Sequence, residues 1–399
     1  MVIARSSYCT GCCACGDVCR FGAITMVYDD EGFLVPGINT SKCVKCNQCV
    51  NVCPANSFTS KNDNIISSYA CWSNDTESRI SSSSGGIFSV LASWIFQNNG
   101  VVYGAAFDES FHVKHGRAEN MNELELLKKS KYIQSEMISV YPMIKKDCEQ
   151  GKLVLFVGTP CQVSALYNYL GYDYEKLYTC DLICHGVGST GYFVDCLGYL
   201  QKNFKSKVTE VVFREKSKGY NKPHLIIRFE NGRMYKQFLY YSIFGHSFTK
   251  SFSVRKSCIE CKYATVPRFG NFTLGDYSGK VYVNFNFNEI KRGISTLLIN
   301  NMKAQLVFEE ISDKIFAKKV DVDYIITTSN RLKGISLKTL EERDEFFAEY
   351  KSLDVKEIIQ KYDMPSREEI RNFKYSGKWN GSVLQLIHKI VYRVKRHIS

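Results

Sequence analysis

The organisation of this chain is decided by two cysteine runs: Cys-Thr-Gly-Cys-Cys-Ala-Cys-Gly-Asp-Val-Cys at residues 9–19, and Cys-Val-Lys-Cys-Asn-Gln-Cys-Val-Asn-Val-Cys-Pro at residues 43–54. Each run spaces four cysteines as Cys-x2-Cys-x2-Cys-x3-Cys, which is the spacing that bacterial chains use to hold two 4Fe-4S clusters. Because the fourth cysteine of each run ligates the other cluster, the spacing predicts two crossed ligand sets. One set is Cys9, Cys12, Cys15 and Cys53, and the other is Cys43, Cys46, Cys49 and Cys19.

The segment between the runs supports a small domain of its own. Residues 23–35 alternate like two short strands around a turn at residues 29–32. The whole segment resembles a ferredoxin domain, although Arg20 stands where proline usually follows the fourth cysteine and Cys13 is an additional thiol. A pair of zinc sites is the alternative, since Cys-x2-Cys pairs also suit tetrahedral zinc. We expect this domain to span residues 1–58 and a polar linker to follow at residues 59–64.

Composition places the chain among globular proteins with more than one domain. It has 399 residues, of which 45% are hydrophobic, and no apolar run reaches the roughly 18 residues that a membrane span needs. An odd number of cysteines (17) and the lack of an apolar leader favour reduced thiols and a cytoplasmic location. The net charge of +12 counts cysteines as neutral; two clusters at about −2 each would lower it to about +8. We therefore expect no nucleic-acid partner.

A serine- and glycine-rich loop opens the second domain. Residues 81–86 read Ser-Ser-Ser-Ser-Gly-Gly and precede residues 87–97, whose apolar positions follow a helical period. Free N–H groups at the start of such a helix suit a phosphate or pyrophosphate. A serine-rich capping loop without a ligand is equally consistent with the residues alone.

The next segments predict an α/β arrangement with chemistry at strand ends. Buried strands are expected at residues 101–107, 152–157 and 177–183, and the last two end at Gly158-Thr159-Pro160-Cys161 and at Cys184-His185-Gly186. Ligands bind at the carboxyl ends of strands in open α/β sheets, so Gly158 and Thr159 are candidate cofactor-binding residues. Further strands are expected at residues 208–214, 272–274 and 294–299, and a hairpin is expected at residues 225–238 around Asn231-Gly232.

The C-terminal part is predicted to be helical and basic. Helices are expected at residues 340–350, 355–362 and 366–373, and residues 383–398 form a basic amphipathic pattern. That last helix would dock on its own domain, bind a partner, or contact an anionic membrane surface. The predicted fold class is thus α+β or α/β with several domains: a ferredoxin-like domain, a mixed-sheet domain at residues 65–330 (parts 65–150 and 151–330), and a helical C-terminal tail at residues 331–399.

The motifs of the second domain, taken together, resemble the beta-subunit family of coenzyme F-420 hydrogenases and dehydrogenases. The resemblance covers roughly residues 69–300 and rests on six segments in this order: residues 82–86, 130–135, 158–162, 184–187, 213–216 and 257–261. It implies an FAD cofactor that exchanges electrons with iron–sulfur clusters. The residues it implies at the flavin are Ser83, Ser84, Gly85, Gly86, Lys131, Tyr132 and Gln134.

The resemblance also implies a third 4Fe-4S cluster near the flavin. Its ligands would be Cys161, Cys184, Cys258 and Cys261. From the residues alone, these four thiols suit a cluster or zinc equally, or are buried and unligated. The remaining cysteines at positions 71, 148, 180 and 196 are expected to be structural. His185 and Asp276 stand near predicted strand ends and are the candidate catalytic residues.

These observations predict an iron–sulfur flavoprotein oxidoreductase that moves electrons between its clusters and a flavin doing two-electron chemistry on an organic acceptor or donor. The alternative is an electron-relay subunit that has no substrate of its own and feeds a partner enzyme. Expected partners are a redox protein such as ferredoxin and a small organic electron acceptor or donor. The sequence does not identify that small molecule, because the residues named above are common to many cofactor sites.

Overall fold

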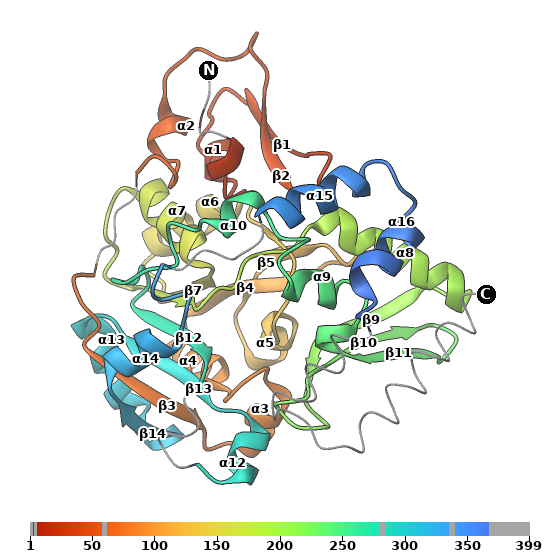
Figure 1. Cartoon of the computed structure of the whole chain (residues 1–399). Helices are drawn as coiled ribbons and strands as arrows, with labels where there is room; N and C mark the ends of the chain where they lie inside the picture. The colour runs from red at the N-terminus through yellow and green to blue at the C-terminus, as the bar shows by residue number, and fades with distance from the viewer. Residues whose placement is uncertain (1–2, 4–5, 58–61, 279–284, 335–339, 367–399) are drawn as a thin grey trace.

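A computed structural model describes residues 3, 6–57, 62–278, 285–334 and 340–366 of the chain. Most of these residues are organised around one mixed sheet of nine strands in the order β14-β3-β13-β12-β8-β7-β4-β5-β6 (Figure 1). Its strands are β3 (Ser67–Ser73), β4 (Val101–Phe107), β5 (Val113–Ala118), β6 (Ser135–Glu136), β7 (Val154–Gly158), β8 (Leu177–Leu182), β12 (Phe272–Asp276), β13 (Ser295–Ile299) and β14 (Ile315–Val320). The neighbouring strands β12, β8, β7 and β4 run parallel, whereas β14, β3 and β13 pair antiparallel.

Helices cover both faces of this sheet. Leu155 of β7 packs in a cluster with α4 (Ile87–Gln97) and α13 (Met302–Glu310), whereas its neighbour Phe156 packs in a cluster with α6 (Val140–Glu149) and α7 (Pro160–Leu170). Successive residues of a strand point to opposite faces, so the two helix pairs lie on opposite sides of the sheet. Each side thus has its own apolar core.

The cysteine-rich N-terminal segment packs against one of these helix layers. It contains η1 (Ser6–Tyr8), α1 (Ala14–Asp17), the antiparallel pair β1 (Ile24–Tyr28) and β2 (Leu34–Ile38), and α2 (Gln48–Asn51). The hairpin confirms the two short strands predicted around residues 29–32. Cys12, Ala14 and Val52 belong to the same core cluster as helices α6 and α7. The segment therefore shares a core with the main body.

A second sheet lies beside the first, in the order β11-β10-β9. Its strands are β9 (Val208–Glu215), β10 (His224–Phe229) and β11 (Met234–Phe238), and the Asn231-Gly232 hairpin is confirmed. The helix α8 (Thr190–Phe204) packs on it. The other helices are α3 (Thr76–Ser81), α5 (Met121–Leu127), η2 (Leu239–Tyr241), α9 (Gly245–Thr249), α10 (Lys256–Ile259), α12 (Phe287–Arg292), η3 (Ser312–Lys314) and α14 (Val322–Thr328).

The C-terminal helices differ in part from the prediction. The helix α15 (Leu340–Tyr350) is confirmed, but the expected helix at 355–362 is a short α16 (Val355–Ile358) followed by the π-helical segment η4 (Ile359–Asp363). Phe346 and Ile358 are fully buried in the core cluster that contains α8 and β9, so these helices do not form a separate tail. Their apolar residues need that shared core because the short helices cannot bury them alone. Most of the expected helix at 366–373, and all of that at 383–398, lie outside the described residues.

Within the described residues, no helix has both the length and the apolar character that a membrane span requires.

Candidate functional site

Four of the N-terminal cysteines surround a cavity at the outer end of the cysteine-rich segment. Cys19 lines it together with Cys43, Cys46 and Cys49, and the cavity volume is about 380 Å³. Cys46 is exposed and Cys49 is buried. We call this group the outer cysteine set. It is the set that the crossed spacing predicted, since Cys19 comes from the first run and its three neighbours come from the second.

The other four N-terminal cysteines form an inner cysteine set, made of Cys9, Cys12, Cys15 and Cys53. Burial raises the pKa of Cys12 to about 12, and the nearby Cys53 and Cys9 raise it further. The same two neighbours add to the effect of burial on the pKa of Cys15. Cys53 therefore lies beside the first run, although the sequence places it in the second. Such thiols are deprotonated when they bind metal, because the cation stabilises the thiolate.

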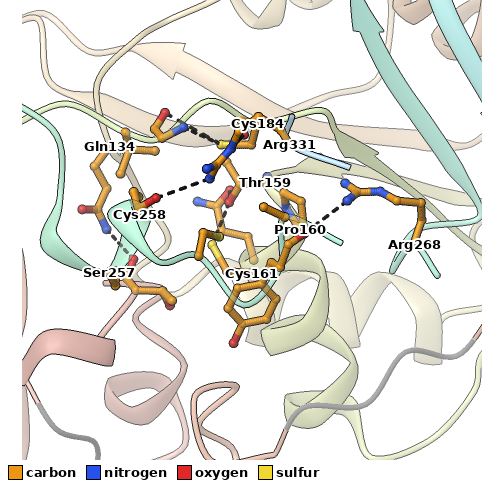
Figure 2. A pocket seen from close by; sticks show the side chains of 16 residues that line it. Gln134, Thr159, Pro160, Cys161, Cys184, Ser257, Cys258, Arg268 and Arg331 are labelled. Carbon is orange, nitrogen blue, oxygen red and sulfur yellow. Dashed lines mark hydrogen bonds between the residues drawn. The ribbon is translucent and has the colours of Figure 1, made fainter. Parts of the chain in front are cut away.

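The four cysteines of the second domain meet in one place. Cys161, Cys184, Cys258 and Cys261 line an open cavity of about 570 Å³ (Figure 2). We call this group the thiol quartet. Burial raises the pKa of Cys161 well above its usual value, and the nearby Cys261, Cys184 and Cys258 raise it further, in that order. The structure thus brings together four thiols that are up to 100 positions apart in the sequence.

Local structure explains where each thiol of the quartet stands. The strand β7 ends at Gly158, and Thr159 forms a capping box with Gln162 at the start of α7. Cys161 follows Pro160 in the first turn, where the helix dipole and free N–H groups favour a thiolate. The Thr159 Oγ1 lies 3.1 Å from the Cys161 Sγ, and the Gly186 N–H donates to the Cys184 Sγ over 3.4 Å.

Two buried polar side chains join the inner cysteine set to the quartet cavity. Gln134 lines the cavity, and its Nε2 donates to the carbonyl oxygens of Thr10 and Gly11 in the first cysteine run, at 3.0 and 2.9 Å. Arg255 donates from Nη1 to the Gln134 Oε1 over 2.7 Å and from Nη2 to the Cys9 Sγ over 3.6 Å. Gln134, which the family resemblance implied at a flavin, therefore lies between two cysteine sites.

Tyr263 also lies between these cysteine groups. Burial raises its pKa, and the thiols of Cys161, Cys12, Cys53 and Cys261 raise it further. The Tyr263 side chain is therefore close to thiols of both the inner set and the quartet. In the described residues, no three His, Cys, Asp or Glu side chains are placed to hold a single metal ion.

The serine–glycine loop is held by the edges of the surrounding strands. The Gly85 N–H donates to the Ser295 Oγ over 2.9 Å, and a Cβ at Gly85 would lie 2.6 Å from the Cys71 carbonyl oxygen. The Ser83 Oγ accepts from the Ser130 N–H, and the Ser84 Oγ donates to the Ile294 carbonyl. Two of the predicted phosphate-binding hydroxyls thus anchor the loop.

Several cations surround this loop. Lys216 donates from its Nζ to the carbonyl oxygens of Ser84 and Arg79, both at 2.8 Å, and of Arg292 at 3.1 Å. Burial lowers the pKa of Lys216 to about 7, and the nearby Arg214 and Arg79 lower it further. Arg79 is itself buried. Positive charge gathers beside the loop, where an anion would be stabilised.

The two predicted catalytic residues lie near one another. Asp276, at the end of β12, forms an ion pair with Arg214 in which the Nη1 lies 2.5 Å from the Oδ2. Burial lowers the pKa of His185, and the charges of Arg331, Asp276 and Arg214 also act on it. Burial raises the pKa of Tyr132 to about 12, and both Arg214 and Asp276 influence it. His185 follows Cys184 directly, so this group adjoins the quartet.

The remaining predicted cofactor-binding residues include Lys131, Gly86 and Thr159. The Nζ of Lys131 donates to the carbonyl oxygens of Ala105, Leu126 and Lys128, and burial lowers the pKa of Lys131 to about 7. Gly86 begins α4 in a left-handed conformation (φ 89°) without a side-chain cap. Thr159 lines the quartet cavity.

Sequence reasoning missed Arg255, Lys216 and Arg79 as site residues. Lys216 belongs to a motif that carried the family resemblance, and Arg255 stands three residues before Cys258. A charged residue close to a cysteine pair is a signal that could have identified Arg255. Arg79 carries no local signal, because its role depends on contacts with residues 289 and 293.

Comparisons with known proteins identify two regions of the chain. Residues 151–324 match the family described as the C terminus of the coenzyme F420 hydrogenase/dehydrogenase beta subunit, and residues 8–57 match a 4Fe-4S dicluster domain. Among solved structures, the F420-reducing NiFe hydrogenase complex from Methanosarcina barkeri, determined as a xenon derivative, contains a similar chain at 16% identity and a TM-score of 0.47. The similarity covers 71% of the present chain and 92% of that one. The comparison with curated proteins found no match. Residues 151–324 therefore form a region similar to the C terminus of the coenzyme F420 hydrogenase/dehydrogenase beta subunit, and a 4Fe-4S dicluster domain precedes it in the chain.

Proposed function

We propose that this chain is an iron–sulfur flavoprotein oxidoreductase that moves single electrons between its dicluster domain and an FAD in its second domain. The observation that carries the proposal is that the three cysteine groups and the group around His185 and Asp276 lie one after another along the molecule, each adjoining the next. The outer cysteine set adjoins the inner set within one small domain, and the inner set adjoins the quartet through Gln134 and Tyr263. The quartet in turn adjoins the group around His185 and Asp276.

The proposal assigns the quartet to a third 4Fe-4S cluster. The alternative is one zinc ion, which needs its sulfur ligands about 3.8 Å apart, given Zn–S bonds of about 2.3 Å in a tetrahedron. In the described residues no three thiols are placed for a single ion, although four of them surround one cavity. The proposal of a cluster is supported by four thiols that line one cavity beside Tyr263, which is also close to the inner set.

The residues around the serine–glycine loop fit the phosphates of FAD. Lys216 and Arg79 bring positive charge to the loop, and the start of α4 lacks a side-chain cap. Burial, and then the nearby Arg214 and Arg79, lower the pKa of Lys216, and a diphosphate there would stabilise its charged form. When bound, FAD exchanges single electrons with clusters and a hydride equivalent with an organic molecule.

The group at the other end of this region suits the flavin ring and the organic molecule. Arg214 holds Asp276 in an ion pair, and its guanidinium lies 5.2 Å from the centre of the Tyr220 ring. The His185 side chain is exposed to solvent, and partial desolvation lowers the pKa of its imidazole below the usual value, so the ring is mostly neutral at pH 7 and can accept a proton at one ring nitrogen. We assign to this group the orientation of the ring and the handling of a proton.

Cofactor analysis of protein purified without oxygen tests the proposal. Three clusters require about 12 iron and 12 sulfide per chain, with one FAD. The Cys261→Ala variant is expected to lose about four iron, whereas Cys148→Ala, which changes a buried thiol in α6 outside the three sites, is expected to lose none. A wild-type preparation that contains zinc and no iron or flavin would refute the assignment.

Turnover separates this proposal from a relay subunit without a substrate of its own. The reduced wild-type chain is mixed with a deazaflavin, with nicotinamide dinucleotides and with other two-electron acceptors. Reduction of any of them, lost in the His185→Ala variant but retained in Cys148→Ala, supports the oxidoreductase. A chain that is fully loaded with clusters and flavin, yet passes electrons to proteins only, is a relay.

A further inference from the structure

The outer end of the dicluster domain has an exposed surface whose charged side chains are all positive. We call it the outer face and define it by residues that surround the outer cysteine set: Arg20, Phe21, Lys42, Val44 and Lys45. All five are exposed, including the apolar side chains of Phe21 (52%) and Val44 (57%). None of the three cations forms an ion pair with any residue that the structure describes.

The acidic residues of this domain are Asp17 and the turn at residues 29–31, and the Asp17 carboxylate accepts the Ser139 N–H of the main body. No Asp or Glu occurs at residues 18–28 or 32–57. The acidic turn at residues 29–31 instead contacts α15, where Glu31 pairs with Arg343, and the Asp30 carboxylate lies 3.8 Å from the Lys351 Nζ. The acidic turn therefore contacts the main body, whereas Arg20, Lys42 and Lys45 are exposed.

The outer set is also the cysteine group that is nearest to solvent. Cys46 is exposed, whereas Cys12 and Cys15 of the inner set are buried, and Cys12 shares a core with helices α6 and α7. Electrons that enter or leave the series at its outer end therefore cross this surface. Exposed apolar side chains ringed by like charges are typical of a transient protein interface, where the charges guide the encounter and the apolar residues make the contact.

We propose that the outer face docks a small acidic electron-carrier protein, which gives or takes one electron at a time at the outer cluster. In the delivering direction the carrier is oxidised by one electron, and the outer cluster is reduced by one. The inference rests on the proposed function, since it requires a cluster at the outer set. The carrier is acidic because three unpaired cations, with no acidic residue among them, would repel a basic protein and attract an acidic one.

Stopped-flow reduction of the anaerobically loaded chain by a reduced acidic ferredoxin tests the proposal. The triple charge reversal Arg20→Glu, Lys42→Glu and Lys45→Glu is expected to lower the second-order rate constant at low ionic strength by at least about tenfold. The wild-type rate constant is expected to fall steeply with added salt, and that of the triple variant is not. Reversal of two exposed lysines of the main body, Lys202→Glu with Lys207→Glu, is the matched control and is expected to have little effect.

Two further measurements keep the outcomes separate. Iron content and the midpoint potential of the outer cluster are measured in every variant, so that a changed cluster is not mistaken for changed docking. The Phe21→Ala variant is expected to slow electron transfer several-fold while the salt dependence persists. Two results would overturn the docking proposal alone. One is equal rate constants in the wild type and the triple variant, and the other is a wild type that small reductants reduce but the ferredoxin does not. A wild type without clusters would overturn the proposed function.

Discussion

Arg255 is a buried cation that contacts the inner cysteine set from the second domain. Only 4% of its surface is exposed, and its guanidinium donates to the Cys9 and Leu34 carbonyl oxygens, both at 2.8 Å, as well as to the Cys9 Sγ. A cluster becomes more negative when it gains an electron. A fixed positive charge and an N–H donor at one of its thiolates therefore stabilise the reduced form.

Replacement of Arg255 by Met is expected to make the midpoint potential of the inner cluster more negative. A hydrogen bond to a charged group contributes about 1.5 kcal/mol, which corresponds to about 60 mV for a one-electron couple. Redox titration followed by electron paramagnetic resonance measures the shift. The control is Arg228→Met, which changes an exposed arginine of β10 that pairs with Glu210 of β9. This variant is expected to leave the potential unchanged. An unchanged or raised potential in Arg255→Met would show that the cation does not tune the cluster.

Lys216 is expected to make FAD binding depend on pH. Its pKa is about 7 in the cofactor-free protein, below the value of about 10.5 in an unfolded chain. Between these values the unfolded chain binds more protons, so this group makes the cofactor-free protein more stable as pH rises from about 7 to 10. A bound diphosphate would raise the pKa again. Binding of FAD near pH 8 should therefore take up a proton, and its affinity should fall as pH rises above about 7.

Calorimetric titration of the flavin-free chain with FAD, in two buffers of different ionisation enthalpy, measures that proton uptake. The Lys216→Met variant is expected to lose the part of the uptake that Lys216 supplies and to bind FAD at least tenfold more weakly. The Lys216→Arg variant keeps the charge at all these pH values, so it should bind without that part of the pH dependence. Equal uptake in all three proteins would assign the proton to another group, such as Lys131.

At the scale of elements, the loop between α3 and α4 depends on a glycine. A Cβ at Gly85 would lie 2.6 Å from the Cys71 carbonyl oxygen and 2.9 Å from the Ser295 nitrogen, so β3 or β13 would have to move. The Gly85→Ala variant is expected to lower the free energy of unfolding by about 1–3 kcal/mol and to weaken FAD retention. The matched control is Gly198→Ala in α8, where nothing lies within 4 Å and a gain of about 0.5–1 kcal/mol is expected. Urea unfolding of both variants measures the difference, and a Gly85→Ala variant as stable as wild type would contradict it.

The elements that the sequence predicts correctly are those with a strong local pattern. The helix α4 was predicted with the bounds that the structure has, because its apolar period begins after Gly-Gly and ends at Asn-Asn-Gly. The β10–β11 hairpin follows from Asn231-Gly232. The strand β14, by contrast, was missed, since only its first and last residues are buried and its interior carries two lysines. Its strand conformation comes from pairing with β3, which no local pattern reveals.

The candidate site divides in the same way. Cysteine spacing predicted the two N-terminal thiol sets, because ligand geometry demands regular spacing within each run, whereas the quartet was implied by the family resemblance. The residues that connect these groups are set by tertiary contacts instead. Arg255 reaches Cys9 across 246 positions, and Lys216 reaches Ser84 across 132, so neither contact leaves a trace in the neighbouring sequence. The position of Gln134 near a flavin, implied by resemblance, stays a prediction, and its contact with the first cysteine run was not predicted.

At the scale of the whole molecule, the dicluster domain is fixed to the main body by a buried cation of α15. The Arg343 side chain is fully buried, and its guanidinium pairs with Glu31 in the β1–β2 turn while its Nε donates to the Val254 carbonyl over 2.9 Å. Val254 precedes Arg255, which holds the inner cysteine set. The helix α15 therefore contacts both the β1–β2 turn of the dicluster domain and the segment of Val254 and Arg255, which connects that domain to the quartet.

Replacement of Arg343 by Met is expected to loosen the dicluster domain without unfolding the main body. The change leaves the partly exposed Glu31 without its counter-ion and the Val254 carbonyl without a donor, which is expected to cost about 1–3 kcal/mol. Hydrogen exchange is expected to be faster at β1, β2 and residues 252–256 and unchanged in β7 and β8. Electron transfer from the dicluster domain to the quartet is expected to be slower. The control is Lys351→Met, which removes an exposed partner 3.8 Å from Asp30 and should cost at most about 0.5 kcal/mol. Because electron transfer depends on the separation of the clusters while cluster assembly depends on the cysteines, Arg343→Met should keep its iron yet transfer electrons more slowly. Wild-type exchange and transfer rates in that variant would mean that the apolar contacts of Cys12, Ala14 and Val52 hold the domain by themselves.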